Sequence, residues 1–271
     1  MDKLPIWSES CLVRFGAIDG SDLKTLDTVF NFFQEAAISH AENLGVGREA
    51  MARTGQVWIL SRISVQVDRR PKYGETVTVR TWPRGGEKLF ALRDFDIRDA
   101  QDAAVRARSC WLIIDIEKRR PLRPQSIMDS LPQNEGMDSL DAALALEERL
   151  SLQKDSEHRA LYTDVDYNGH VNNVSYIRWI EDAVDPALLE RAGRMRLDIN
   201  YMNEVRPGEI TGVWSAAIEE AAHGAAHNGE LPRAFAFEGR KIGDEYVDPR
   251  SPIPDSSKNQ TAFRAELRLW Q

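Results

Sequence analysis

Cysteine and long apolar runs are both scarce in this sequence of 271 residues. The two cysteines, Cys11 and Cys110, lie far apart and outside any metal-type spacing, so neither a disulfide scaffold nor a zinc module is predicted. No apolar run approaches the roughly 18 residues of a membrane helix, and the start, MDKLPIWSES, lacks the apolar core of a signal peptide. These absences predict a cytoplasmic protein without a membrane span.

Basic residues are outnumbered by acidic ones, 35 against 43, which gives a formal net charge of -8. This balance argues against a general nucleic-acid-binding surface, because such surfaces present positive charge to phosphate. Two local basic clusters remain: Arg69, Arg70 and Lys72, and Lys118, Arg119, Arg120 and Arg123. Each is either a solvated strand end or loop, or a docking site for an acidic partner.

The common nucleophile and cofactor motifs are also missing: there is no G-x-S-x-G elbow, no P-loop and no H-E-x-x-H. The stretch GVGREA, residues 45–50, follows a helical pattern instead of a strand, so we interpret it as a helix C-cap and turn. His223 and His227 have helical metal-ligand spacing, but Gly224 weakens a helix there and no third ligand is apparent. We therefore expect no metal and no cofactor.

The most informative feature present is an internal repeat. Residues 15–35 align with residues 162–182, which places Asp19 on Asp166 and Phe32 on Trp179. Residues 63–79 align in the same way with residues 197–213. Identity is low, but order and spacing agree, so the sequence predicts two halves of one design.

Each half reads as a strand, a polar turn, a helix and then a series of strands. One apolar stripe on each helix recurs at a spacing of three and four residues, at Leu26, Val29, Phe30, Phe33 and Ala37, and at Val171, Val174, Ile177, Ile180 and Val184. Segments with strand-like composition follow at 56–68, 75–84, 89–99 and 103–116, and at 195–203, 209–220, 232–242 and 261–271. This order predicts an α+β fold in which each half wraps an antiparallel sheet around a long helix.

The predicted domain boundaries follow from the repeat: a first half over residues 1–124 and a second over residues 156–271. Between them, residues 125–155 are acidic and irregular, with some helical character over residues 140–152, and we interpret them as a linker.

The stretch DVDYNGHVNN, residues 164–173, is the strongest candidate for chemistry. It has a structural interpretation, because Asn-Gly favours a turn and Asn172 or Asn173 can cap the following helix. The first half, however, makes the same transition with Ser21 and Leu23 where the second has Asn168 and His170. The second half also has a glutamate where the first has Arg70. The predicted acid-base group is Asp166, Asn168, His170 and Glu204.

At these residues the sequence resembles the acyl-acyl-carrier-protein thioesterases of plants and bacteria, which have a double hot-dog fold. The resemblance covers nearly the whole chain, including FNFFQEAAISHAENLG, RARSCWLIIDIEKRRPLR, DVDYNGHVNNVSYIRWIED and INYMNEVRPGE. It implies that the four residues named above are catalytic. Many plant members have a cysteine directly after the glutamate, whereas this sequence has Val205, so no cysteine nucleophile is expected there.

The resemblance also implies the substrate, a fatty acyl group carried by acyl-carrier protein, an acidic partner for the basic clusters. We expect Glu204 to deprotonate an attacking water and His170 to position that water or relay its proton, while direct attack by a carboxylate stays an alternative. Backbone N–H groups after Gly169 would stabilise the oxyanion. An apolar tunnel in the first half would hold the chain, lined by Phe32, Phe33, Trp58 and Leu60.

Two alternative functions stay open at this point. One keeps the fold and replaces the carrier protein by coenzyme A, as in single hot-dog thioesterases with a related D-x-D-x-x-G-H-V-N-N motif. Another is a non-catalytic sensor of acyl thioesters. The oligomeric state is also open, between a monomer and a homodimer.

Overall fold

The computed structural model describes residues 3–23, 25–100, 102–218, 232–244 and 260–271, and the chain splits into two compact units, Met1–Leu144 and Ala145–Gln271. We describe each unit by itself as unit 1 and unit 2. His223 and His227 lie outside the described residues.

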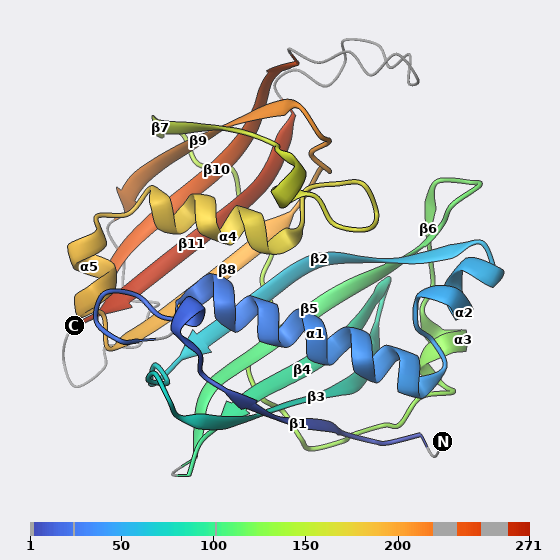
Figure 1. Cartoon of the computed structure of the whole chain (residues 1–271). Coiled ribbons are helices and arrows are strands. Elements are labelled where there is room, and N and C mark those ends of the chain that lie inside the picture. Colours follow the sequence, from blue (N-terminus) through green and yellow to red (C-terminus); the bar gives the residue numbers. More distant parts are fainter. Residues whose placement is uncertain (1–2, 24, 101, 219–231, 245–259) are drawn as a thin grey trace. The chain divides into compact units, whose positions relative to one another are not determined.

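Unit 1 is an antiparallel sheet with one long helix across it (Figure 1). Its strands lie in the order β1, β3, β4, β5, β2, and β6 pairs with β5. Its elements are β1 (Trp7–Leu12), the 3-10 turn η1 (Phe15–Ala17), α1 (Leu26–Leu44), α2 (Arg48–Arg53), β2 (Gln56–Val67), β3 (Thr76–Glu87), β4 (Phe90–Arg98), β5 (Ala103–Asp115), β6 (Arg120–Leu122) and α3 (Gln125–Met128).

Unit 2 repeats this design. Its strands are all antiparallel and lie in the order β8, β11, β10, β9, β7. Its elements are β7 (Gln153–Arg159), the 3-10 turn η2 (Tyr162–Asp164), α4 (Asn173–Asp182), α5 (Pro186–Arg191), β8 (Arg194–Tyr201), β9 (Glu209–Ile218), β10 (Arg233–Asp244) and β11 (Thr261–Trp270).

The apolar stripes predicted for the two helices are buried, which confirms both helices and their faces. Val171 and Val184, at the ends of the second stripe, lie just outside α4. In unit 1, the ring of Phe33 on α1 lies 4.8 Å from that of Phe95 on β4. Gly45 ends α1 in the left-handed conformation at a φ of 75°, which confirms the predicted C-cap and turn at the start of residues 45–50. From Arg48 on the interpretation is wrong, because the short helix α2 begins there. The predicted strand segments coincide with β2 to β5 and β8 to β11.

The segment interpreted as a linker differs from expectation. Its helical character over residues 140–152 is wrong, because no helix forms there; the only helix of the segment is the short α3. The part up to Leu144 belongs to unit 1, where Met128, Leu131 and Ala143 are buried. We call residues 134–139 the strap.

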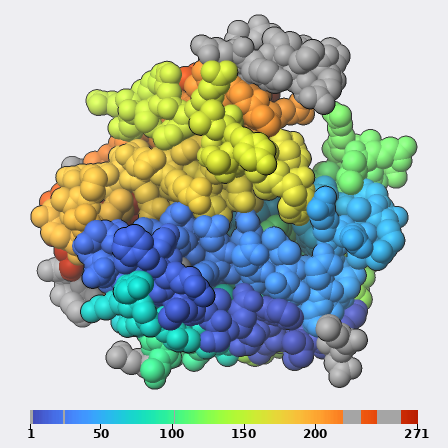
Figure 2. Space-filling view, in the orientation of Figure 1, coloured from blue at the N-terminus to red at the C-terminus, as the bar shows by residue number. Residues whose placement is uncertain are grey.

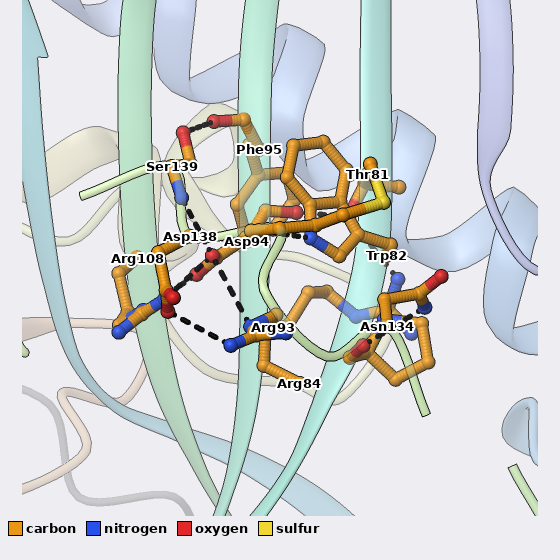
Figure 3. A network of polar contacts seen from close by, with 12 residues as sticks. Thr81, Trp82, Arg84, Arg93, Asp94, Phe95, Arg108, Asn134, Asp138 and Ser139 are labelled. Atoms are coloured by element: carbon orange, nitrogen blue, oxygen red, sulfur yellow. Dashed lines mark hydrogen bonds and ion pairs between the residues drawn. The ribbon is translucent and has the colours of Figure 1, made fainter. Parts of the chain in front are cut away.

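The strap is fastened to the face of the unit 1 sheet that α1 does not cover (Figure 3). Phe95 points toward α1, so its neighbour Asp94 points to the opposite face. There Asp94 has no solvent exposure and accepts two hydrogen bonds from Arg108, of 2.6 and 2.7 Å, and one of 2.9 Å from the Ser139 backbone N–H. Asp138 accepts hydrogen bonds from Arg84 and Arg108 at 2.8 and 2.6 Å.

The chain beyond the strap is fastened in a similar way within unit 2. The Leu146 N–H donates to the Asn200 side chain at 2.8 Å, and Arg149 donates to Glu266 on β11 at 2.6 Å. Residues 134–149 therefore form hydrogen bonds within unit 1 before Leu144 and within unit 2 after Ala145.

Removing the Asp94 carboxylate should destabilise unit 1. In Asp94→Ala the mostly buried Arg108 loses its two-point partner, and we expect the free energy of unfolding to fall by roughly 3 kcal/mol in urea denaturation. Asp102→Ala is the matched control, because that carboxylate is largely exposed and pairs with Arg98 at 3.3 Å; it should cost less than about 1 kcal/mol. Equal small losses in both variants would show that the buried pair does not hold the unit together.

Candidate active site

The turn that carries the candidate residues closes on itself by hydrogen bonds. The Asp166 N–H donates to the His170 carbonyl at 2.9 Å, and the Gly169 N–H donates to the Asp166 carbonyl at 3.0 Å. Asp166 also accepts the Asn168 N–H through its side chain at 2.8 Å. Gly169 has a φ of 79°, a left-handed conformation that favours glycine.

The helix after this turn begins with a side-chain cap. Asn172 accepts the Val174 N–H at 2.9 Å through its amide oxygen and stands at the N-cap of α4. The structural interpretation of the motif is therefore correct for Asn172. In the space-filling view the segment around residues 160–175, in yellow, reaches the surface (Figure 2), and Tyr167 is 58% exposed.

The first repeat makes the same turn with the same hydrogen bonds. The Asp19 N–H donates to the Leu23 carbonyl at 2.9 Å, and Asp19 accepts the Ser21 N–H at 2.8 Å. The Thr25 N–H donates to the Ala17 carbonyl, just as Asn172 donates to Asp164. The side chains of Asn168 and His170 are thus not needed to make the turn.

Glu204 follows β8 and lies beside this turn. The Val171 N–H donates to the Val205 carbonyl at 2.8 Å, and the Nε2 atom of His170 lies 3.0 Å from a carboxylate oxygen of Glu204. Both side chains are accessible, at 30% and 52% exposure. The structure therefore brings His170 and Glu204 together, while Asn168 meets Asp166 at 3.4 Å.

The corresponding position in the first repeat has a different chemistry. Arg70 is 5% exposed and forms an ion pair with Asp19, and it also donates to the Leu23 carbonyl at 3.3 Å. Arg69 in turn pairs with Glu75 at 3.4 Å. The prediction of a docking surface at Arg69, Arg70 and Lys72 is therefore wrong for Arg70, because the charge of Arg70 is buried and compensated within the protein.

His170 differs from the other histidines that the structure describes. His40 is fully buried, its Nε2 lies 2.9 Å from the Leu4 carbonyl, and burial lowers its pKa to about 4. His158 stacks on Trp179 with ring centroids 5.0 Å apart, and burial lowers its pKa as well. Of the described histidines, only His170 contacts a carboxylate.

The predicted backbone oxyanion donors are mostly occupied. Within the turn and the helix start, acceptors in the protein already bind the N–H groups of Asn168, Gly169, Val171, Asn172 and Val174. A substrate oxyanion would have to displace them, so this expectation needs correction. The side-chain amide of Asn168, held only by a long 3.4 Å contact on an exposed residue, is the better placed donor.

The residues predicted to line an acyl tunnel all lie in unit 1. Phe33 is 2% exposed and belongs to the core under α1. Phe32, Trp58 and Leu60 are half-buried. The indole N–H of Trp58 donates to the Val46 carbonyl at 2.9 Å, and its ring packs against a small apolar cluster that includes Leu44 and Met128.

Within the described ranges, no group of three or more His, Cys, Asp or Glu side chains is arranged to hold a metal ion. No helix among these residues has the length and apolarity needed to cross a membrane. Both cysteines are free thiols.

The chain matches two family models, the acyl-ACP thioesterase N-terminal domain over residues 6–131 and the acyl-ACP thioesterase C-terminal domain over residues 147–235. The chain belongs to the acyl-ACP thioesterase family. An acyl-ACP thioesterase from Bacteroides thetaiotaomicron has a similar structure, with a TM-score of 0.76 at 22% identity over 98% of both chains. The 12:0-ACP thioesterase from Umbellularia californica gives a TM-score of 0.74 at 19% identity, covering 98% of this chain and 94% of that one. The predicted double hot-dog fold is confirmed.

Among plant relatives, a chloroplastic palmitoyl-acyl carrier protein thioesterase from Cuphea hookeriana is 29% identical over 216 residues, which is 73% of this chain and 52% of the relative. An Arabidopsis thaliana oleoyl-acyl carrier protein thioesterase is 23% identical over 252 residues, 82% of this chain and 67% of the relative. The chain spans about half the length of several of these plant relatives, such as the Cuphea hookeriana thioesterase.

The repeated turn predicts that the side chains of His170 and Asn168 contribute little to stability. His170→Leu and Asn168→Ser restore the residue types of the first repeat, so each should change the free energy of unfolding by less than about 1 kcal/mol in urea denaturation. Gly169→Ala is the contrasting variant, because a left-handed φ should cost about 1 to 2 kcal/mol once a Cβ is present. A large loss in His170→Leu would mean that the imidazole is needed to build the turn.

Proposed function

We propose that this chain hydrolyses fatty acyl thioesters of acyl-carrier protein, releasing the fatty acid and the free carrier thiol. The observation that carries the proposal is the accessible His170–Glu204 pair at 3.0 Å, at a turn that also carries Asp166 and Asn168. The first repeat has the same turn with a compensated ion pair instead. Family membership and the names of the relatives support this substrate class.

The reaction uses a base and an oxyanion donor. Glu204 removes a proton from a water molecule, with His170 holding that water or relaying the proton, and the hydroxide adds to the thioester carbonyl carbon. Asn168 donates its amide N–H to the developing oxyanion, and Asp166 orients Asn168. Collapse of the tetrahedral intermediate breaks the carbon–sulfur bond, and the thiolate takes up the proton.

The acyl chain is proposed to contact Phe32, Trp58 and Leu60, which stay partly accessible in unit 1, and less so the core residue Phe33. Gly169 is proposed to let the backbone of the turn lie close to the substrate. We also propose a cytoplasmic location, which the two free thiols support.

Hydrolysis of a panel of acyl-carrier proteins, from short to long chains, tests this function. Glu204→Gln, His170→Ala and Asp166→Asn should each reduce kcat by roughly 10²- to 10⁴-fold, the usual contribution of an acid-base group. Glu157→Gln is the matched control: its carboxylate is equally exposed, at 51%, and lies in the same unit, so kcat should not change.

Four results would contradict the proposal or a part of it. Wild-type rates in all three variants would show that these residues are not catalytic. Binding of the acyl carrier without turnover would favour a sensor. Faster hydrolysis of the same acyl group on coenzyme A would show that the substrate class is acyl-CoA. Unchanged chain-length profiles after substitutions at Phe32, Trp58 and Leu60 would remove these residues from the chain-binding site.

We further propose that the carrier protein docks on the second basic cluster, residues 118–123, at the hairpin between β5 and β6. Its four basic side chains are exposed. Arg120→Glu and Arg123→Glu should raise KM several-fold for the carrier-bound substrate, and added salt should do the same in the wild type. The coenzyme A substrate and the control Arg191→Glu, an exposed arginine on α5, should show no such effect; equal effects on both substrates would exclude docking here.

A further inference from the structure

Unit 2 contains a lysine in its interior that the proposed reaction does not use. Lys241 on β10 lies opposite Thr211 on β9, and Thr211 lies opposite His158 on β7. Because residues directly opposite each other share a face of the sheet, and His158 stacks on Trp179 of α4, this row faces the helix. Lys241 is 7% exposed, and lysines are so deeply buried in proteins almost only when they are paired.

The partner of Lys241 is Glu209, at the start of β9. The Nζ atom of Lys241 lies 3.0 Å from one carboxylate oxygen of Glu209, which is 9% exposed. The same oxygen accepts the Arg206 N–H at 2.7 Å, and the Glu209 N–H donates to the Arg206 carbonyl at 3.1 Å. The turn that begins two residues after Glu204 is therefore closed by Glu209 and tied to β10 through Lys241.

The first repeat closes the same turn with Glu75 but takes the cation from a different place. Glu75 accepts the Lys72 N–H at 3.0 Å and pairs with Arg69 at 3.4 Å. The side chains of Arg69 and Glu75 are each 36% exposed, unlike the buried pair of the second repeat. In the alignment of the halves, Arg69 falls on Asn203, directly before Glu204.

The strand position of Lys241 differs between the repeats together with this arginine. The strand registers of β4 and β10 place Asp99 at the position that corresponds to Lys241, and Asp99 pairs with Arg69. The second repeat thus has a basic group on the strand and a neutral asparagine beside Glu204. Glu209 is neutralised from the interior, and position 203 offers the Glu204 carboxylate no cation that would compete with His170.

We propose that Lys241 is a positioning residue, whose ion pair with Glu209 holds the turn after Glu204 and so sets the Glu204 carboxylate against His170. This inference rests on the proposed function. The Val171 N–H fixes one side of this loop through the Val205 carbonyl, and Lys241 fixes the other side through Glu209. Without the ion pair, the segment between Val205 and β9 would lose one of the contacts that set the position of Glu204.

The test replaces both members of the pair. Lys241→Met alone would leave the Glu209 carboxylate buried without its cation and destabilise the unit. Lys241→Met combined with Glu209→Gln removes both charges and keeps an acceptor for the Arg206 N–H, so we expect this double variant to fold. Its kcat should fall about 10- to 100-fold with KM nearly unchanged, because a misplaced base slows the chemical step without weakening substrate binding.

The matched control is Arg240→Met combined with Glu238→Gln. This pair, at 2.8 Å, lies on the same strand and includes a carboxylate that is 3% exposed. Successive residues of a strand point to opposite faces, so the control pair lies on the face away from α4, and kcat should stay within about 2-fold of wild type. In a Glu204→Gln background, the Lys241 and Glu209 substitutions should add no further loss.

Three kinetic results would overturn the inference: a wild-type kcat in the Lys241 and Glu209 double variant, an equal loss in the control, or losses that simply multiply with Glu204→Gln. Hydrogen exchange of the Arg206 amide provides a readout that does not need hydrolysis. It should be faster in the double variant and unchanged in the control, and unchanged exchange in both would also overturn the inference. If the wild type hydrolyses no acyl thioester, the proposed function fails, and this exchange alone decides whether Lys241 holds the turn after Glu204.

Discussion

One backbone hydrogen bond, from the Val171 N–H to the Val205 carbonyl, ties the start of α4 to the loop after β8. The pairing of His170 with Glu204 depends on it, because His170 lies just before one end of this bond and Glu204 just before the other. Side chains as flexible as glutamate meet a partner reliably only when the backbone fixes their starting points. Here the hydrogen bond between Val171 and Val205 fixes the starting points of His170 and Glu204.

In the first repeat the same turn carries charged groups that are largely buried. Arg70 and Asp19 neutralise each other in a largely buried position, and removing either partner alone would leave an uncompensated charge. In the second repeat the carboxylate and the imidazole stay open to water, where such a pair contributes little to stability. Duplication thus separates two tasks that conflict within one site, holding the turn together and keeping reactive groups available.

Much of this arrangement was predictable from the sequence, because it follows from periodicity and from comparison of the halves. The stripe that includes Phe30 and Phe33 must be buried whatever its neighbours are, and the replacement of Arg70 by Glu204 is visible in an alignment. The strap was not predictable, because Asp138 and Ser139 form hydrogen bonds with residues on strands about 30 to 50 residues earlier in the chain.

The hydrogen bonds of the strap affect where this chain can be divided into fragments. A fragment ending at residue 124, where the irregular segment begins, would expose Asp94 and Arg108 and remove the Ser139 and Asp138 groups that satisfy them. A fragment of unit 2 beginning near residue 156 would likewise lose the chain that covers Asn200 and Glu266. The natural place to cut is the peptide between Leu144 and Ala145, inside a stretch that looks dispensable in the sequence and is structural on both sides.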